Sequence, residues 1–163
     1  MDNALDIKES AFNTIVQWLR EYNFQVNVSA MNKNQDADIQ FEAEVYPPNE
    51  KNMFFYVTFR NQFNDSFAIR AIMGFSEQDK KYIEGLKNKD QQQIFIDIRK
   101  LVYPLNINCD TRFPTTTLHK LIFIDSLRQK QYFFYSVFGM VNAMQLASAR
   151  IDEVRNLFYP EGA

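Results

Sequence analysis

The chain has 163 residues, of which 46% are hydrophobic and 23% are charged. This length is enough for one domain with a hydrophobic core, and this composition excludes a chain that is disordered throughout. The formal net charge of −2 at pH 7 gives no overall field that would favour nucleic acid or an anionic membrane. We therefore expect neither as a partner.

The only cysteine is Cys109, so no intrachain disulfide is possible. The first nine residues are polar and acidic, without the apolar stretch of a signal peptide. The longest apolar runs are shorter than a membrane span requires. These features predict a cytoplasmic protein that does not enter a membrane.

The N-terminal part is predicted to be a helix over residues 6–22 followed by a short extended segment. The apolar residues that recur at helical spacing are Ile7, Ala11, Ile15, Trp18, Leu19 and Tyr22. Asp6, with Glu9 three residues later, predicts a capping box at the start of this helix. Residues 24–28 alternate between apolar and polar and predict a short strand or an extended lead-in, and residues 32–36 predict a polar loop.

Residues 53–74 predict a β-hairpin, because two runs rich in β-branched and aromatic residues flank a polar loop over 61–65. One apolar face results from four cross-strand pairs, which are Phe59–Phe67, Val57–Ile69, Phe55–Ala71 and Met53–Met73. The other face then pairs Tyr56 with Arg70 and Phe54 with Ile72.

Residues 38–46 alternate regularly and predict a third antiparallel strand, with Val45 facing Phe55 and Phe41 facing Phe59. The second face of this three-stranded sheet then carries cross-strand rows. Two of these rows are Glu44–Tyr56–Arg70 and Gln40–Arg60–Ser66.

The C-terminal half predicts helices on either side of a second strand pair. Ser76 with Asp79 predicts a capped helix start, residues 87–90 predict a break, and Asp90 with Gln93 predicts a second cap. The inward residues expected before the stop at Pro104 are Tyr82, Ile83, Leu86, Ile94, Ile98, Leu101 and Val102. Strands are predicted over 107–113 and 118–125, with a turn at 114–117. A long helix is predicted over 128–159, with an inward stripe of Phe134, Val137, Val141, Met144, Ser148, Ile151, Val154 or Arg155, and Phe158.

This order predicts a single α+β domain over residues 1–163, with the elements α-βββ-α-ββ-α and helices packed mainly on one face of an antiparallel sheet. The layout resembles the type III secretion chaperone-like fold, which is also found in small uncharacterised archaeal and bacterial proteins. The resemblance covers residues 6–158 and rests on element order and hydrophobic pattern. It implies a dimeric chaperone-like protein that holds segments of a partner in extended form. It carries no catalytic residues over to this chain.

Few residues suggest catalysis or metal binding. His119 is the only histidine, and with Cys109 it supplies at most half of a metal site. We therefore expect a surface or hairpin-packing histidine and a small buried thiol. Glu42 and Glu44 share one face of a strand, where acidic residues are ordinary. The motifs of phosphate loops, zinc sites and nucleophile elbows do not occur. We expect no cofactor, no metal and no enzymatic activity.

The second sheet face is the strongest functional signal. It gathers aromatic, aliphatic and arginine side chains, a combination typical of interaction surfaces. The residues are Tyr46, Phe54, Tyr56, Arg60, Arg70 and Ile72. The opposing interpretation is that a helix covers this face too. We expect a protein partner or a homodimer, and the alternative is a small enzyme or ligand-binding domain with a pocket between sheet and helices.

Overall fold

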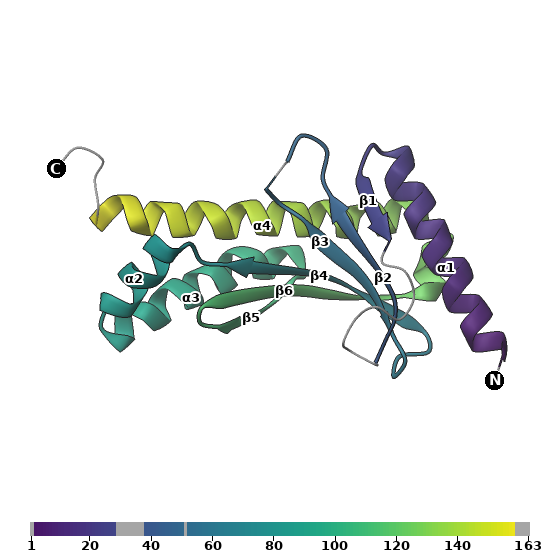
Figure 1. The fold of residues 1–163 in the computed structure, drawn as a ribbon, viewed down its shortest axis with the longest axis horizontal. Helices are drawn as coiled ribbons and strands as arrows, with labels where there is room; N and C mark the ends of the chain where they lie inside the picture. Colours follow the sequence, from purple (N-terminus) through teal and green to yellow (C-terminus); the bar gives the residue numbers. More distant parts are fainter. Residues whose placement is uncertain (1, 29–37, 51, 159–163) are drawn as a thin grey trace. The chain divides into compact units, whose positions relative to one another are not determined.

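The computed structural model describes residues 2–28, 38–50 and 52–158, and the loop predicted over 32–36 lies outside them. The fold is α+β, with four α-helices and a six-stranded antiparallel sheet of strand order β1-β2-β3-β4-β6-β5 (Figure 1). The helices are α1 (Asp2–Glu21), α2 (Glu77–Gly85), α3 (Asn88–Val102) and α4 (Lys130–Phe158), with short 3₁₀ segments η1 (Tyr103–Leu105) and η2 (Ile124–Arg128). The strands are β1 (Gln25–Val28), β2 (Ile39–Tyr46), β3 (Phe55–Arg60), β4 (Ser66–Gly74), β5 (Asn108–Arg112) and β6 (Thr115–Phe123).

The chain forms two compact units, described separately below. The first contains residues 1–71 and 120–137, and the second contains residues 72–119 and 138–163. Strands β4 and β6 and helix α4 each contribute residues to both units. That the whole chain is one domain with its helices mainly on one sheet face stays a prediction.

The β2–β3–β4 sheet of the first unit has the predicted register. Val45 pairs with Phe55, Phe41 with Phe59, and Val57 with Ile69. Residues that alternate along these strands therefore share an inner face, which is almost fully buried. Its members are Phe41, Ala43, Val45, Phe55, Val57, Phe59, Phe67, Ile69 and Ala71.

One predicted row of the sheet is wrong. Arg60 pairs with Ile39 and not with Gln40, because the register shifts between Ile39 and Phe41. A shift of one residue moves side chains to the opposite face of a strand. Ser66, which was expected on the solvent side, is only 2% exposed. The row Glu44–Tyr56–Arg70 is confirmed.

Helix α1 packs on this inner face and buries Ala11, Ile15 and Leu19 as predicted, but the start of its stripe differs. Phe12 is buried and stacks on Phe41 at 5.4 Å between ring centroids, whereas Ile7 is 49% exposed. Lys8 takes the inward position, since its ammonium group donates a hydrogen bond to the carbonyl of Arg60 at 3.0 Å. The helix also runs through Asp6, so the predicted capping box there is wrong.

In the first part of α4, Phe133 is fully buried against the same sheet. Its ring centroid lies 6.3 Å from that of Phe67 and 5.9 Å from that of Trp18. The inner face of the first unit is therefore covered by aromatic side chains from two helices.

In the second unit, α2 begins as predicted. Ser76 is the N-cap, its hydroxyl accepts from the amide of Asp79, and the carboxylate of Asp79 accepts in return. The predicted second cap is wrong, because α3 begins at Asn88 after Lys87 and no side chain caps it. Leu101 is 38% exposed, contrary to its predicted inward position, whereas Ile94, Ile98 and Val102 are buried.

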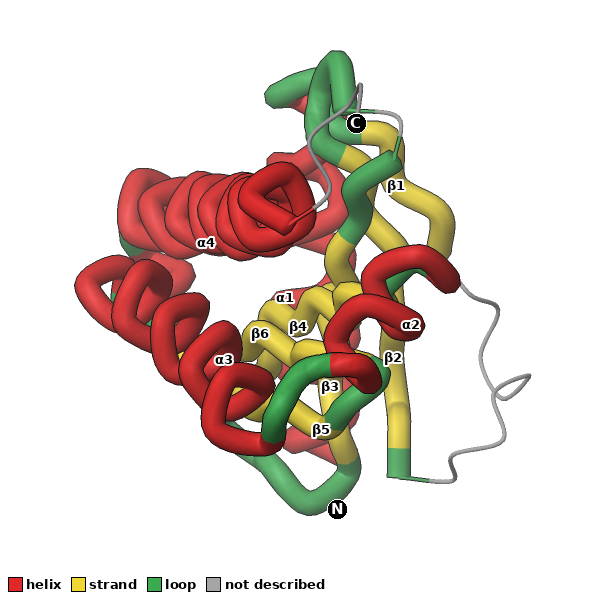
Figure 2. Tube along the Cα trace, turned by 90° about the vertical axis from the view of Figure 1, so that its left-hand side faces the viewer, coloured by secondary structure: helices red, strands yellow, loops and turns green. Residues whose placement is uncertain are grey.

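The β5–β6 hairpin is tighter than predicted, since β6 starts at Thr115 and the residues expected to form a turn pair in the ladder. The second part of α4 lies beside α3 (Figure 2), and Arg150 joins them through Asp97. Its buried side holds Met144 and Val154, as predicted, together with Met140, Ala143 and Ala147, which the predicted stripe lacks. Val141, Ser148 and Ile151 are only half-buried.

Within the described residues, no helix has both the length and the apolar character needed to cross a membrane.

Candidate functional site

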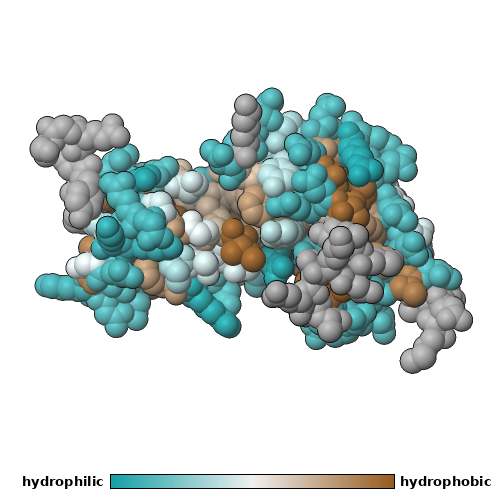
Figure 3. Space-filling model, viewed as in Figure 1, coloured by the Kyte–Doolittle hydropathy of each residue, from teal (hydrophilic) through white to brown (hydrophobic). Residues whose placement is uncertain are grey.

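The outer face of the β2–β3–β4 sheet is the candidate site. It is the side opposite the one on which Phe12 and Phe133 pack, and the same alternation that buries Phe55 and Val57 places Tyr56 here. On the face of the molecule shown in Figure 3, hydrophobic side chains appear between hydrophilic ones over the strands of the sheet.

Three half-buried rings form a continuous ladder on this face. The centroids of Tyr46 and Phe54 lie 5.5 Å apart, and those of Phe54 and Tyr56 lie 5.5 Å apart, with Phe54 and Tyr56 edge to face. The guanidinium of Arg70 continues the ladder at 5.7 Å from the centroid of the Tyr56 ring. Ring spacings of this size are favourable, and so is a guanidinium at this distance from a ring. We call these four residues the aromatic ladder.

A buried carboxylate holds the polar end of the ladder. Glu42 is 9% exposed, accepts a hydrogen bond from the Thr58 hydroxyl at 3.0 Å, and lies 3.6 Å from a terminal nitrogen of Arg70. Arg70 is thereby held between a ring and a carboxylate. Its Nε and the Oε1 of Gln40 are buried, and neither has a hydrogen-bond partner among the described residues.

The structure brings together four of the six residues predicted for this site, namely Tyr46, Phe54, Tyr56 and Arg70. Arg60 lies apart from the ladder and pairs with Asp38 at 3.0 Å. Ile72 is 43% exposed in the part of β4 that belongs to the second unit. The prediction missed the role of Glu42 and Thr58, although the predicted pairing of Phe41 with Phe59 already sets these two residues opposite each other.

The surroundings of Tyr46 and Tyr56 raise the pKa of both tyrosines of the ladder. A hydrogen bond to Glu44 is the main reason that the pKa of Tyr46 is raised above its ordinary value. Burial, followed by the charges of Glu44 and Glu42, raises the pKa of Tyr56. Both effects disfavour the phenolate form.

We expect Glu44→Gln to lower the pKa of Tyr46 toward the ordinary value, because the replacement removes the negative charge beside the phenol. The pKa of Tyr56 should fall less, since burial is its main cause. In the folded parent protein the raised values favour the protonated form, so stability should decline as the pH rises above about 10. Ultraviolet titration of single-tyrosine replacements measures both values. An unchanged Tyr46 titration in Glu44→Gln would contradict this electrostatic account.

His119 and Cys109 lie in the second unit and do not form a pair. His119 is opposite Asn108 in the β5–β6 ladder, and Cys109 is opposite Leu118. Burial raises the pKa of the Cys109 thiol, which lies 3.7 Å from the hydroxyl of Thr111. Among the residues that the structure describes, no three histidine, cysteine, aspartate or glutamate side chains are grouped as a metal site would require.

The second unit has its own partly apolar surface, which we call the helix groove. It is a hollow of about 400 Å³ between α3 and α4, and Leu101 and Leu146 are both exposed in it. Arg150 crosses its floor to Asp97 at 2.7 Å and to Glu153 at 3.2 Å. Burial alone would raise the pKa of Asp97, but hydrogen bonds from Arg150 and Gln93 lower the pKa below its usual value.

The fold is that of an α+β protein with an antiparallel sheet, and the comparisons place it in a family. The chain belongs to the family described as "Uncharacterized conserved protein (DUF2299)", which matches residues 11–150. It is also similar to a solved structure, "Crystal structure of an uncharacterized protein from Methanothermobacter thermautotrophicus", with 18% identity and a TM-score of 0.72. That similarity covers 88% of this chain and 97% of the other, and it shows the fold alone. No curated protein matches the chain.

Proposed function

We propose that this protein is a non-enzymatic binding module that holds a protein partner on the outer face of its sheet, as secretion-chaperone-like proteins do. The observation that carries the proposal is the aromatic ladder. The Phe54 ring contacts the rings of both Tyr46 and Tyr56, and all three rings remain partly exposed. Tyrosine, phenylalanine and arginine are enriched at protein interfaces, and tyrosine and arginine are among the residues that contribute most of the binding energy.

By analogy with the secretion-chaperone-like layout, we expect an extended segment of the partner as the occupant. The rings of Tyr46, Phe54 and Tyr56 would then support its apolar side chains.

Phe54→Glu is the direct test of this proposal. A carboxylate between Tyr46 and Tyr56 would break the ladder and place a negative charge where the partner's apolar groups should rest. We expect partner binding or self-association to weaken at least about tenfold, which is about 1.4 kcal/mol, with little change in fold. Analytical ultracentrifugation and circular dichroism on the same samples measure both properties.

Phe63→Glu is the matched control, because Phe63 is an exposed aromatic in the β3–β4 loop that makes no ladder contact. It introduces the same charge into the same unit and should leave association unchanged. Equal loss in the two variants would show a general charge effect. A Phe54→Glu protein that no longer folds would mean that the outer face is part of the core.

Self-association through the helices is the other form of the same proposal. The helix groove supports it, since Leu101 and Leu146 expose aliphatic surface on neighbouring helices. Leu146→Glu should weaken a dimer formed by the groove and leave binding at the aromatic ladder unchanged. The pair Phe54→Glu and Leu146→Glu therefore assigns any observed association to the sheet or to the helices.

The alternative of a small enzyme or ligand-binding domain has one specific observation in its favour. A hollow of about 480 Å³ lies between α1 and η2, with Ile7 and Leu127 among its apolar groups and Asp6, Asp125 and Arg128 among its charged ones. This hollow is lined by helical segments, whereas the sequence predicted a pocket between sheet and helices. A ligand that raises the melting temperature of the parent protein but not of Leu127→Glu would favour this alternative.

A further inference from the structure

The ammonium group of Lys130 lies in a cage of side chains at the end of α1. It is 5.6 Å from the centroid of the Trp18 ring, 5.3 Å from the centroid of the Tyr22 ring, and 2.5 Å from Oε2 of Glu21. Two ring faces and a carboxylate thus surround one cation. We call Trp18, Glu21 and Tyr22 the cation cage.

The cage is built by the fold and does not depend on Lys130 for its walls. Glu21 and Tyr22 lie three and four residues after Trp18, which places both next to Trp18 at the C-terminal end of α1. The Tyr22 ring stacks on Phe134 at 4.0 Å between centroids, and the Trp18 ring packs against Phe133 at 5.9 Å. Phe133 and Phe134 are buried, so both walls of the cage rest on the core.

The cage is open to solvent at the same time. Tyr22 is 47% exposed, and the side chains of Glu21 and Lys130 are 44% and 36% exposed. The hydrogen bond from Lys130 is the main reason that the pKa of Glu21 is lowered, so this carboxyl group is ionised at neutral pH. A cation that replaces Lys130 would lie beside the same carboxylate and the same two ring faces.

We propose that the cation cage is a binding site for the organic cation of a ligand, a quaternary ammonium group, and that Lys130 is the intramolecular occupant which such a ligand displaces. Aromatic faces attract organic cations through the ring quadrupole, and this is the established way of recognising quaternary ammonium groups. A quaternary group is weakly hydrated and presents methyl groups to the rings. The site lies on α1 and α4, away from the aromatic ladder, and is independent of the function proposed above.

Lys130 competes with any free cation for the cage and so lowers the apparent affinity of the site. Because Lys130 is part of the chain, its effective concentration at the cage is far higher than that of a free ligand at ordinary concentration. Free cations therefore bind weakly to the parent protein, and removing the lysine side chain uncovers the site. The same competition means that a ligand bound at the cage releases the first residue of α4 from the last turn of α1.

Choline binding to Lys130→Ala tests the proposal, with the fluorescence of Trp18 as the signal. Trp18 is the only tryptophan of the chain, so the signal comes from the wall of the cage itself. We expect a saturable change with a Kd at least tenfold lower than in the parent protein. Dimethylbutanol, the uncharged carbon isostere of choline, should give no saturable change. Lys130→Ala combined with Tyr22→Leu should lose the response.

Two further variants keep the result unambiguous. Lys130→Met removes the charge but keeps the apolar stem, so it serves if Lys130→Ala does not fold by circular dichroism. Lys80→Ala removes a lysine that pairs with Glu77 elsewhere in the chain, and it should respond as the parent protein does. If neither Lys130 variant shows saturable choline binding, or if the isostere binds equally well, Lys130 serves only to fasten α1 to α4 and the proposal is overturned.

Discussion

Phe55→Ala is expected to lower the free energy of unfolding by about 3–5 kcal/mol, the usual cost of truncating a buried phenylalanine. Phe55 is fully buried in β3, opposite Val45, and its ring meets the edge of Phe24 with 6.3 Å between centroids. The truncation removes these contacts and leaves a cavity that the rigid sheet cannot close. Equilibrium denaturation in urea measures the loss.

Phe54→Ala is the matched control, because Phe54 is the preceding residue and carries the same side chain on the opposite face. Its ring is half-buried against Tyr46 and Tyr56, so we expect a loss of about 1 kcal/mol or less. If Phe55→Ala loses much more stability than Phe54→Ala, then successive side chains of β3 point to opposite faces of the sheet, as the register requires. A loss under about 1 kcal/mol for Phe55→Ala would reject the register.

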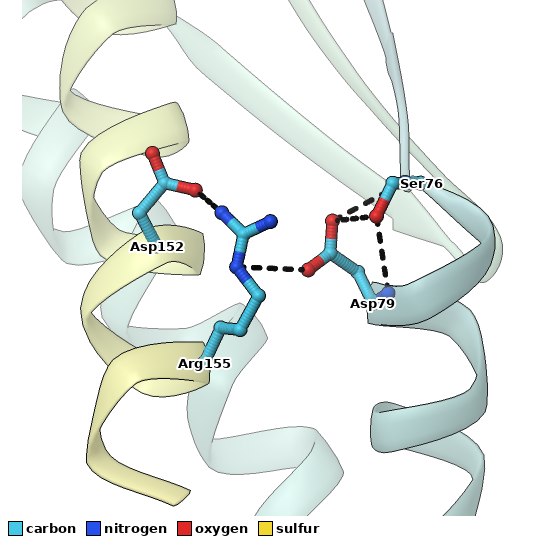
Figure 4. Close-up of polar contacts among 4 residues, drawn as sticks. All are labelled: Ser76, Asp79, Asp152 and Arg155. Carbon is cyan, nitrogen blue, oxygen red and sulfur yellow. Dashed lines mark hydrogen bonds and ion pairs between the residues drawn. The ribbon is translucent and has the colours of Figure 1, made fainter. Parts of the chain in front are cut away.

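Asp79→Ala is expected to cost about 2 kcal/mol, since it removes the carboxylate half of the capping box and a buried ion-pair partner together. The Asp79 carboxylate is nearly buried and accepts from the hydroxyl of Ser76 at 2.5 Å and from its amide at 3.3 Å (Figure 4). Its other oxygen lies 3.7 Å from Nε of Arg155 in α4. The substitution should lower the thermal unfolding temperature. It should also reduce the helical circular-dichroism signal to which α2 contributes.

Asp152→Ala is the control for this prediction, because Asp152 pairs with the same arginine one turn away on α4 (Figure 4). This aspartate is half-exposed, and exposed pairs at this helical spacing contribute only about 0.2–0.5 kcal/mol. A much larger effect at Asp79 than at Asp152 would assign the stabilisation to the buried cap and its partner. Equal effects would show that the burial of Asp79 contributes nothing.

These stability measurements also prepare the functional tests. Phe55→Ala and Asp79→Ala should reduce stability without touching the aromatic ladder, whereas Phe54→Glu should reduce binding without unfolding the protein. Variants of the first kind therefore show how far a loss of stability alone weakens association. If Phe54→Glu weakens binding more than these destabilised variants do, the additional loss comes from contacts on the outer face.

The hairpin and its third strand were predictable from sequence because their side chains alternate strictly. In residues 39–46 and 55–60 every second residue is apolar, and a one-residue slip would expose this whole set to water. Apart from the row of Arg60 and Ser66, the register and the inward residues of this sheet were therefore determined by the local pattern. The Ser76–Asp79 cap was predictable for a similar reason, because both of its partners lie within one helical turn.

The helices were less predictable, because several rotations of an amphipathic helix bury similar apolar area. On α1 the sequence favoured Ile7 over Lys8, and the structure buries Lys8 since a strand carbonyl accepts its hydrogen bond. On α4 the alanines at 143 and 147 face inward in place of the larger Val141 and Ile151. Small residues face inward where a neighbouring element lies close to the helix. The hydrophobic pattern of the sequence contains no information about the distance between the two elements.

The candidate sites were also predictable only in part. Alternation along the strands put Tyr46, Phe54, Tyr56 and Arg70 on one face, so the sequence alone determined the aromatic ladder. The register shift at Ile39, the placing of Glu42 beside Arg70, and the enclosure of Lys130 by Trp18 and Tyr22 were decided only by the tertiary structure. Lys130 and Glu21 are 109 residues apart, and only packing of α1 and α4 on the same sheet brings such residues together.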